Sequence, residues 1–169
     1  ALPIYGISED FASLESESSD IPFGLGSGGG VIFGVTGGVT EAVLRNAMGH
    51  KGSVKTIEHM GQRGFEDIKE FDIPFGDKTL HAAVVSGLGN TRKLIEAIEH
   101  GEVHYDFVEV MACPGGCVGG GGQPIHDGEE LARTRGENLY FLDKNAPLRF
   151  SHENPDVLRL YRDFFEKPL

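Results

Sequence analysis

Apolar and polar residues alternate along residues 65–75 (FEDIKEFDIPF), and a second, more apolar stretch follows at residues 78–87 (KTLHAAVVSG). Alternation with a period of two is typical of β-strands, and Gly76 and Asp77 between the stretches favour a turn. The second stretch is apolar at consecutive positions, as in a strand that is buried on both faces. The pattern therefore predicts a pair of strands, the second of which lies in the core.

The pattern changes to helical spacing after this second strand. Over residues 90–100, Leu94, Ile95 and Ile98 fall on one face of a predicted helix, and charged residues occupy the other face. An apolar strand at residues 105–111 (YDFVEVM) follows. A strand, a helix and a strand in this order form a right-handed crossover, which makes the two strands parallel. Ligands of such sheets bind beyond the carboxyl ends of the strands, so the loop after the last strand is the expected place for a site.

The remainder of the chain carries weaker signals. We expect a helix from Thr36, as its cap, to residue 48, a short strand at 55–59, a helix from 127 or 128 to 135, and a helix at 155–165 capped by Asn154. Residues 1–20 are polar and acidic, which predicts a flexible lead-in, followed by one lobe at residues 21–169. Together these elements predict an α/β fold, a three-layer lobe with a mostly parallel sheet flanked by helices.

Composition narrows the classes of partner. The 169 residues carry a net charge of −11 and have a pI near 5.0, which argues against binding to nucleic acid or to an anionic membrane surface. No apolar run approaches the length of about 18 residues that a membrane span needs. The sequence begins at Ala1 without a methionine, as expected of a piece of a longer polypeptide. We expect a soluble protein of the reducing cytoplasm, where free thiols persist.

The most informative motif is a loop with the chain's only two cysteines, Cys113 and Cys117, followed by glycines at 119–122. A proline after the first cysteine disfavours helical backbone there, and Gly115 and Gly116 can adopt positive φ, so both sulfurs can face one side. The glycine run lets backbone N–H groups approach an anionic ligand. Two cysteines are too few for a disulfide framework. A buried structural cysteine pair in a flexible loop is the alternative to thiolate ligation of a metal centre, and the glycine context favours the metal centre.

The string EVMACPGGCVGGGGQP (residues 109–124) resembles, almost letter for letter, the last of the three cluster-binding signatures of [FeFe]-hydrogenases. The resemblance extends over nearly the whole chain. GGGVIFGVTGGVTEAVLR (residues 28–45) is similar to the family's glycine–phenylalanine segment, and PLRFSHENPDVLRLYRDFF (residues 147–165) to its C-terminal helix. Thr40 stands where relatives often carry Met, which is a mild departure.

The resemblance implies a cofactor and roles for named residues. In that family four cysteines hold a [4Fe–4S] cube, and one of them bridges to a diiron unit, the two together forming the H-cluster. By motif position Cys113 is a cube ligand and Cys117 the bridging ligand, with Gly115 and Gly116 shaping the loop between them. Met111 and Phe33 match residues that line the diiron pocket. The implied reaction is the reversible reduction of two protons to H₂.

The ligand count departs from the family pattern, because a [4Fe–4S] cube needs four thiolates and this chain has two. The family's two earlier signatures lie on the first lobe of its catalytic domain, and neither resembles any part of this sequence. The resemblance therefore implies the second lobe alone, with the first lobe as its missing partner and ferredoxin or NAD(P)-linked domains as electron donors. We expect the isolated chain to be inactive and free of cluster, and an uncovered docking face would favour self-association.

Other functions remain open. One is a non-catalytic relative of the hydrogenases that serves in iron–sulfur protein assembly, although such relatives usually carry Ser at the position of Gly115. Another is a binding module that has lost its metal. Residues 24–29 satisfy the dinucleotide pattern G-x-G-x-x-G, but an acidic stretch broken by Pro22 precedes them where a buried strand is needed. Zinc bound by the cysteines with His104 or His126 lacks the usual ligand spacing.

Overall fold

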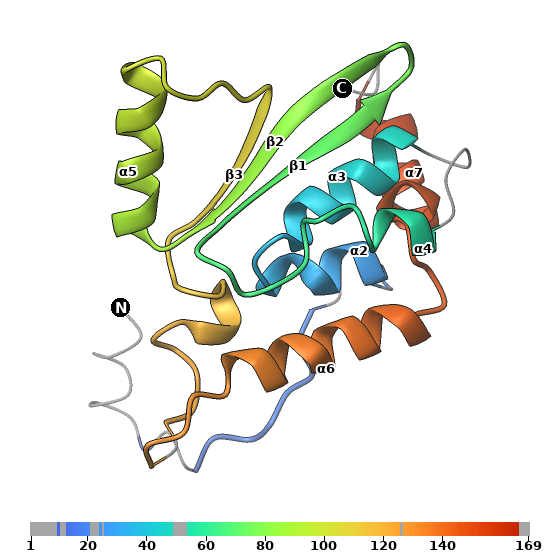
Figure 1. Ribbon diagram of the computed structural model, residues 1–169. Coiled ribbons are helices and arrows are strands. Elements are labelled where there is room, and N and C mark those ends of the chain that lie inside the picture. The colour runs from blue at the N-terminus through green and yellow to red at the C-terminus, as the bar shows by residue number, and fades with distance from the viewer. Residues whose placement is uncertain are drawn as a thin grey trace.

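The computed structural model describes residues 10, 13–20, 24, 26–48, 54–125 and 127–165. Its sheet has the strand order β1-β2-β3, with β1 at Ile68–Phe75, β2 at Lys78–Ser86 and β3 at Phe107–Met111 (Figure 1). β1 and β2 are antiparallel and joined by a turn in which Gly76 has a φ of 62°, whereas β2 and β3 are parallel. The α/β class, the hairpin and the parallel crossover are confirmed. The sheet is mixed, however, because parallel pairing does not extend to β1.

Helices cover both faces of this sheet, so the lobe has the three layers that the sequence predicts (Figure 1). On one face Leu94 of the crossover helix packs on Ala83 and Val85, and on the other Leu44 and Ile57 pack on residues of β1 and β2. The helical segments are α2 (Gly28–Val31), η2 (Ile32–Gly34), α3 (Gly38–Met48), α4 (Val54–Ile57), α5 (Leu88–Glu99), η4 (Cys117–Gly119), α6 (Ala132–Asn145), η5 (Ser151–Glu153) and α7 (Pro155–Phe164).

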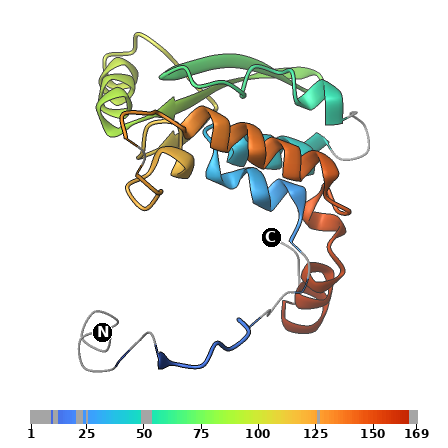
Figure 2. The ribbon, with the colours of Figure 1, turned by 90° about the horizontal axis from the view of Figure 1, so that it is seen from below.

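A further apolar cluster lies on the side of α3 away from the sheet, where α6 runs beside α2 (Figure 2). Ile32 and Val35 are fully buried there, against Val118 of η4 and Ala132 of α6. Because Val118 directly follows the second cysteine, this cluster fixes the cysteine loop to the body of the lobe.

Charged side chains form a buried network between α3, α6 and the loop that follows α4. Arg45 of α3 is 1% exposed and donates to both carboxylate oxygens of Asp143, each at 2.7 Å, and to Glu41 at 2.6 Å. The outer members of the network are Glu58, Arg63 and Arg149. Glu41, Glu58 and Asp143 are the only three potential metal ligands that converge among the described residues, and arginines already neutralise them.

One of the two predicted helix caps is confirmed and the other is wrong. Asn154 caps α7 as predicted, because its side-chain oxygen accepts from the backbone N–H of Asp156 at 2.9 Å. The predicted cap of α3, Thr36, is wrong. The carboxylate of Glu109 on β3 accepts from the backbone N–H groups of Gly37 and Thr40, each at 2.7 Å, so a tertiary contact replaces the local cap.

Residues 55–59 do not form the predicted strand. Ile57 is fully buried and Val54 is half-buried, whereas the two residues between them are exposed, a spacing of three that fits one turn of α4. The predicted face of α5 is also partly wrong. Leu94 is 5% exposed as expected, but Ile95 and Ile98 are 49% and 41% exposed, because α5 packs mainly on β2 and leaves its other side uncovered.

The helix predicted from residue 127 or 128 to 135 is displaced along the chain. α6 begins at Ala132 and continues through Gly136 to Asn145. A Cβ at Gly136 would lie 2.9 Å from Phe65 and 3.1 Å from Val35, so this glycine permits close packing inside the helix. In the lead-in predicted at residues 1–20, Asp10 and residues 13–20 are exposed, and the other positions lie outside the described residues.

Candidate metal centre

The cysteine loop begins at the carboxyl end of β3, next to the end of β2, where the crossover predicts a site. Ser86 at the end of β2 pairs with Met111 at the end of β3. The carbonyl of Met111 accepts from the N–H of Gly87 at 2.8 Å, so the two strand ends are held together where the loop starts. The sheet therefore fixes the base of the loop before its first cysteine.

The loop then turns back through hydrogen bonds between its own backbone groups. Gly116 N donates to the carbonyl of Cys113 at 3.0 Å, and Gly120 N donates to the carbonyl of Cys117 at 3.0 Å. Gly115 and Gly116 have φ of 79° and 92°, the left-handed region that the sequence predicts for them. Both cysteines are free thiols, Cys113 half-buried and Cys117 exposed, so the exposed sulfur is available to a ligand from outside the lobe.

Close backbone approach explains a glycine at position 116. A Cβ there would lie 2.9 Å from both the carbonyl oxygen of Gly34 and the backbone nitrogen of Thr36. Thr36 N also donates to the carbonyl of Gly115 at 3.0 Å. The glycine–phenylalanine segment and the cysteine loop are therefore in direct contact, although about 80 residues separate them in the sequence.

The two predicted pocket-lining residues have different surroundings. Met111 is half-buried at the end of β3, two residues before the first cysteine. Phe33 is 47% exposed, and its ring lines a groove of about 470 Å³ with Val43 of α3 and with Leu158 and Tyr161 of α7. Their roles beside a metal stay predictions.

Buried charged groups lie behind the loop, and sequence reasoning missed them. Lys69 of β1 is 6% exposed, and its ammonium donates to the carbonyl of Gly64 at 2.9 Å and to Thr36 at 3.3 Å. Burial lowers the pKa of Lys69 to about 8, although Glu109 and Glu66 oppose that shift. A signal existed in the sequence, because Lys69 and Glu109 occupy positions at which the predicted strands should carry an apolar residue.

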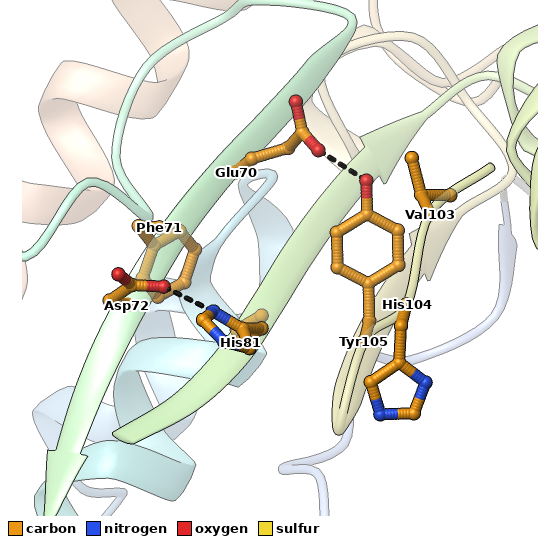
Figure 3. A pocket seen from close by; sticks show the side chains of 8 residues that line it. Glu70, Phe71, Asp72, His81, Val103, His104 and Tyr105 are labelled. Carbon is orange, nitrogen blue, oxygen red and sulfur yellow. Dashed lines mark hydrogen bonds and ion pairs between the residues drawn. The ribbon is translucent and has the colours of Figure 1, made fainter.

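Two of the described histidines, His81 and His104, lie away from the cysteines. A cavity of about 430 Å³ beside β2 and the loop before β3 is lined by His81 and His104 (Figure 3). His81 is paired with Asp72 at 2.6 Å, and Tyr105 donates to Glu70. His104 precedes β3 whereas Cys113 follows it, so the strand separates them and they cannot share one zinc ion. His126 lies outside the described residues.

Comparison with known protein families identifies the class of this α/β domain. The family model described as "Iron only hydrogenase large subunit, C-terminal domain" matches residues 4–121, which is more than half of the chain. The model described as "Iron hydrogenase small subunit" matches residues 129–169. The chain belongs to the iron-only, or [FeFe], hydrogenase family.

Individual relatives agree with this assignment. The chain is 46% identical over 163 residues to the NADP-reducing hydrogenase subunit HndD of Solidesulfovibrio fructosivorans, and 39% identical over 165 residues to iron hydrogenase 1 of Clostridium pasteurianum. These matches cover 95% and 94% of this chain but 28% and 29% of the relatives. The cytosolic Fe–S cluster assembly factor narfl of Xenopus tropicalis is 33% identical over 140 residues, covering 79% of this chain and 28% of that protein.

Solved structures give the same result for the fold. A structure of apo [FeFe]-hydrogenase HydA1 from Chlamydomonas reinhardtii aligns with a TM-score of 0.60 at 35% identity, covering 98% of this chain and 49% of that one. The [FeFe]-hydrogenase HydA(deltaEFG) aligns with the same TM-score and identity, covering 98% and 50%. Within the part of the chain that the structure describes, no helix has both the length and the apolar character of a membrane span.

Proposed function

We propose that this chain is the second lobe of an [FeFe]-hydrogenase catalytic domain, which catalyses the reversible reduction of two protons to H₂. The observation that carries the proposal is the cysteine loop. Two free thiols lie on a loop that glycines and strand ends hold in place, at the edge of the sheet where ligands of such folds bind. Family membership supports an iron–sulfur ligand for these thiols.

The donor set fits half of the implied cofactor. A [4Fe–4S] cube takes four thiolates, and Cys113 and Cys117 supply two. The other two must come from another polypeptide segment, and the chain spans less than a third of the length of the relatives compared. We expect the isolated chain to be inactive and to carry no stable cube.

The lobe's own residues would hold and enclose the group. Cys113 would bind one iron of the cube, and Cys117, the exposed thiol, would bind at the junction with the diiron unit. The backbone N–H groups of Gly119 and Gly120 already donate to the carbonyls of Gly116 and Cys117, each at 3.0 Å, so these two glycines would keep the shape of the loop rather than bind an anionic cluster. Met111 and Phe33 would line one wall of the cluster pocket and exclude water from it. When bound, the group would pass two electrons from a donor to two protons, which is the redox chemistry that side chains cannot supply.

Electron donors and compartment also belong to this proposal. HndD is described as an NADP-reducing hydrogenase subunit, which agrees with an NAD(P)-linked donor, and ferredoxin is the other candidate. We place the protein in the cytoplasm because free thiols persist in a reducing compartment.

The assembly-factor alternative is less well supported. The hydrogenase HndD is 46% identical to the chain, whereas narfl is 33% identical. Gly115 has a φ of 79°, and a Cβ there would lie 3.1 Å from Phe65, so a serine at this position would be strained in this loop.

A chimera tests the function. This chain replaces the matched 163-residue region of HndD, and the chimera is produced with hydrogenase maturation proteins and assayed for H₂. We expect H₂ production that Cys117→Ser abolishes and that Gly89→Ala preserves, because Gly89 is exposed on α5 and a Cβ there meets nothing within 4 Å. Normal turnover in the Cys117→Ser chimera would contradict the proposal.

A further inference from the structure

Ser86 connects the sheet to the centre of the cysteine loop. This serine is the last residue of β2 and is 3% exposed. Its hydroxyl oxygen accepts from the backbone N–H of Gly115 at 2.6 Å and lies 3.4 Å from the carbonyl oxygen of Cys113, to which it donates. One side chain therefore contacts the backbone of the first cysteine and of the glycine two residues later.

Ser86 is itself held at both backbone groups. Its N–H donates to the carbonyl of Asp67 at 2.9 Å, and its carbonyl accepts from the side-chain amide of Asn90 at 2.8 Å. Its parallel partner in the sheet is Met111. Because Asp67 and Asn90 hold the backbone of this residue, the position of its hydroxyl is set independently of the loop.

The loop contact of Ser86 is one half of a clamp on Gly115. The carbonyl on the other side of this glycine accepts from the N–H of Thr36 at 3.0 Å. Gly115 is buried and has a φ of 79°. Glycine adopts positive and negative φ about equally readily, so its own preference does not determine this conformation. The two hydrogen bonds therefore select the conformation of the turn from Cys113 to Gly116, which leads directly into Cys117.

We infer that Ser86 is the positioning residue of the cysteine loop, which fixes the relative placement of Cys113 and Cys117 before any metal is bound. That this placement serves cluster binding rests on the proposed function. The placement itself is a property of the metal-free chain, so it can be measured without the cluster.

The first measurement uses the metal-free full chain. Ser86→Ala removes the acceptor of a buried N–H group, so we expect amide hydrogen exchange at Gly115 to become about tenfold faster, the size expected for one hydrogen bond. Alkylation of the half-buried Cys113 by iodoacetamide, followed by mass spectrometry, should accelerate about threefold or more. Unfolding in urea establishes that the variant is folded.

A matched control separates positioning from a general loss of stability. Thr91 is 9% exposed, and its hydroxyl donates to the carbonyl of Gly87 at 3.0 Å, so Thr91→Val also removes one buried hydrogen bond near the end of β2. It should leave Gly115 exchange and Cys113 alkylation within about twofold of wild type. Equal acceleration in Ser86→Ala and Thr91→Val, or wild-type values in Ser86→Ala, would overturn the inference.

An isosteric pair adds a spectroscopic readout in the chimera with HndD. Ser86→Thr keeps the hydroxyl and Ser86→Val replaces it with a methyl group of the same shape, so the reduced cube should keep wild-type EPR g-values in the threonine variant and shift them in the valine variant. Identical spectra in the two variants would count against positioning by Ser86. A chimera without H₂ production or cluster would instead contradict the proposed function, and the exchange data from the metal-free chain would stand.

Discussion

Replacing Arg45 by methionine tests the buried charge network that joins α3 to α6. The guanidinium of Arg45 donates to both carboxylate oxygens of Asp143 at 2.7 Å and to Glu41 at 2.6 Å, and it is 1% exposed. Methionine fills much of the same volume but leaves two buried carboxylates without this partner. The helices it joins lie in the segments matched by the large-subunit and small-subunit family models, so the network links those two segments.

The size of the effect follows from the partners that remain. Removing one member of a buried ion pair costs about 3–5 kcal/mol of unfolding free energy. Asp143 keeps Arg149 at 2.7 Å and Glu41 keeps Arg63 at 2.6 Å, which places this variant at about 3 kcal/mol, the lower end of that range. With a urea slope of about 2 kcal/mol per molar, the unfolding midpoint should fall by about 1.5 M.

The cost should depend on pH. Burial alone raises the pKa of Asp143 and of Glu41, but the hydrogen bonds and charges of the arginines outweigh it and hold both pKa values below the ordinary 3.8 and 4.5. The stability from these lowered pKa values is present above the ordinary values and is lost as the pH falls through the lowered ones. The difference between wild type and Arg45→Met should therefore be full at pH 7 and shrink below about pH 4.

Urea unfolding at pH 7 and at pH 3.5, followed by circular dichroism, measures both effects. Arg162→Met is the matched control, because Arg162 pairs with Asp163 at 2.8 Å but is 72% exposed, and it should leave the midpoint unchanged. An Arg45→Met midpoint equal to that of wild type at pH 7, or a difference that grows on acidification, would show that the buried network does not stabilise the fold in this way.

Three further changes have defined outcomes. Burial lowers the pKa of Lys69 to about 8, so between about pH 8 and 10.5 the unfolded state keeps a proton that the folded state has released. The unfolding free energy of wild type should therefore rise over this pH range. Lys69→Met should flatten the rise in urea titrations, and an unchanged slope would contradict the prediction. Gly116→Ala should lower the melting temperature and expose Cys113, since its Cβ would lie 2.9 Å from two backbone atoms, whereas Gly121→Ala, with nothing within 4 Å, should behave as wild type in the same melts. Glu109→Gln places an amide against the N–H groups at the start of α3, so it should destabilise the chain by about 1–3 kcal/mol in urea titrations, and a neutral result would show that the carboxylate is not needed there.

The sequence predicted those parts of the fold that depend on neighbouring residues. The hairpin around Gly76, the crossover that ends at Met111 and the Asn154 cap all follow from local periodicity and turn chemistry, and all are present. The strand that the sequence predicts at residues 55–59 is wrong, because five residues hold too little periodicity to separate a strand from one helical turn.

Tertiary contacts account for what the sequence did not predict. Glu41 and Arg45 have the spacing of an ordinary exposed pair on a helix, and only the approach of Asp143 from α6 makes them a buried network. The same holds at the site. The motif identifies Cys113 and Cys117, whereas the support from Ser86 depends on the end of β2 meeting the loop. Periodicity along one segment carries no information about such partners.

Iron content shows whether the two cysteines of this chain are half of a cluster's ligand set. The purified chain, reconstituted anaerobically with iron and sulfide, is compared with the HndD chimera by iron analysis and Mössbauer spectroscopy. We expect no stable [4Fe–4S] cube in the monomeric chain, a cube in the chimera, and its loss in the chimera with Cys113→Ser, because Cys113 and Cys117 are two of four required thiolates. A stoichiometric cube in the monomeric chain, or an intact cube in the Cys113→Ser chimera, would contradict this expectation.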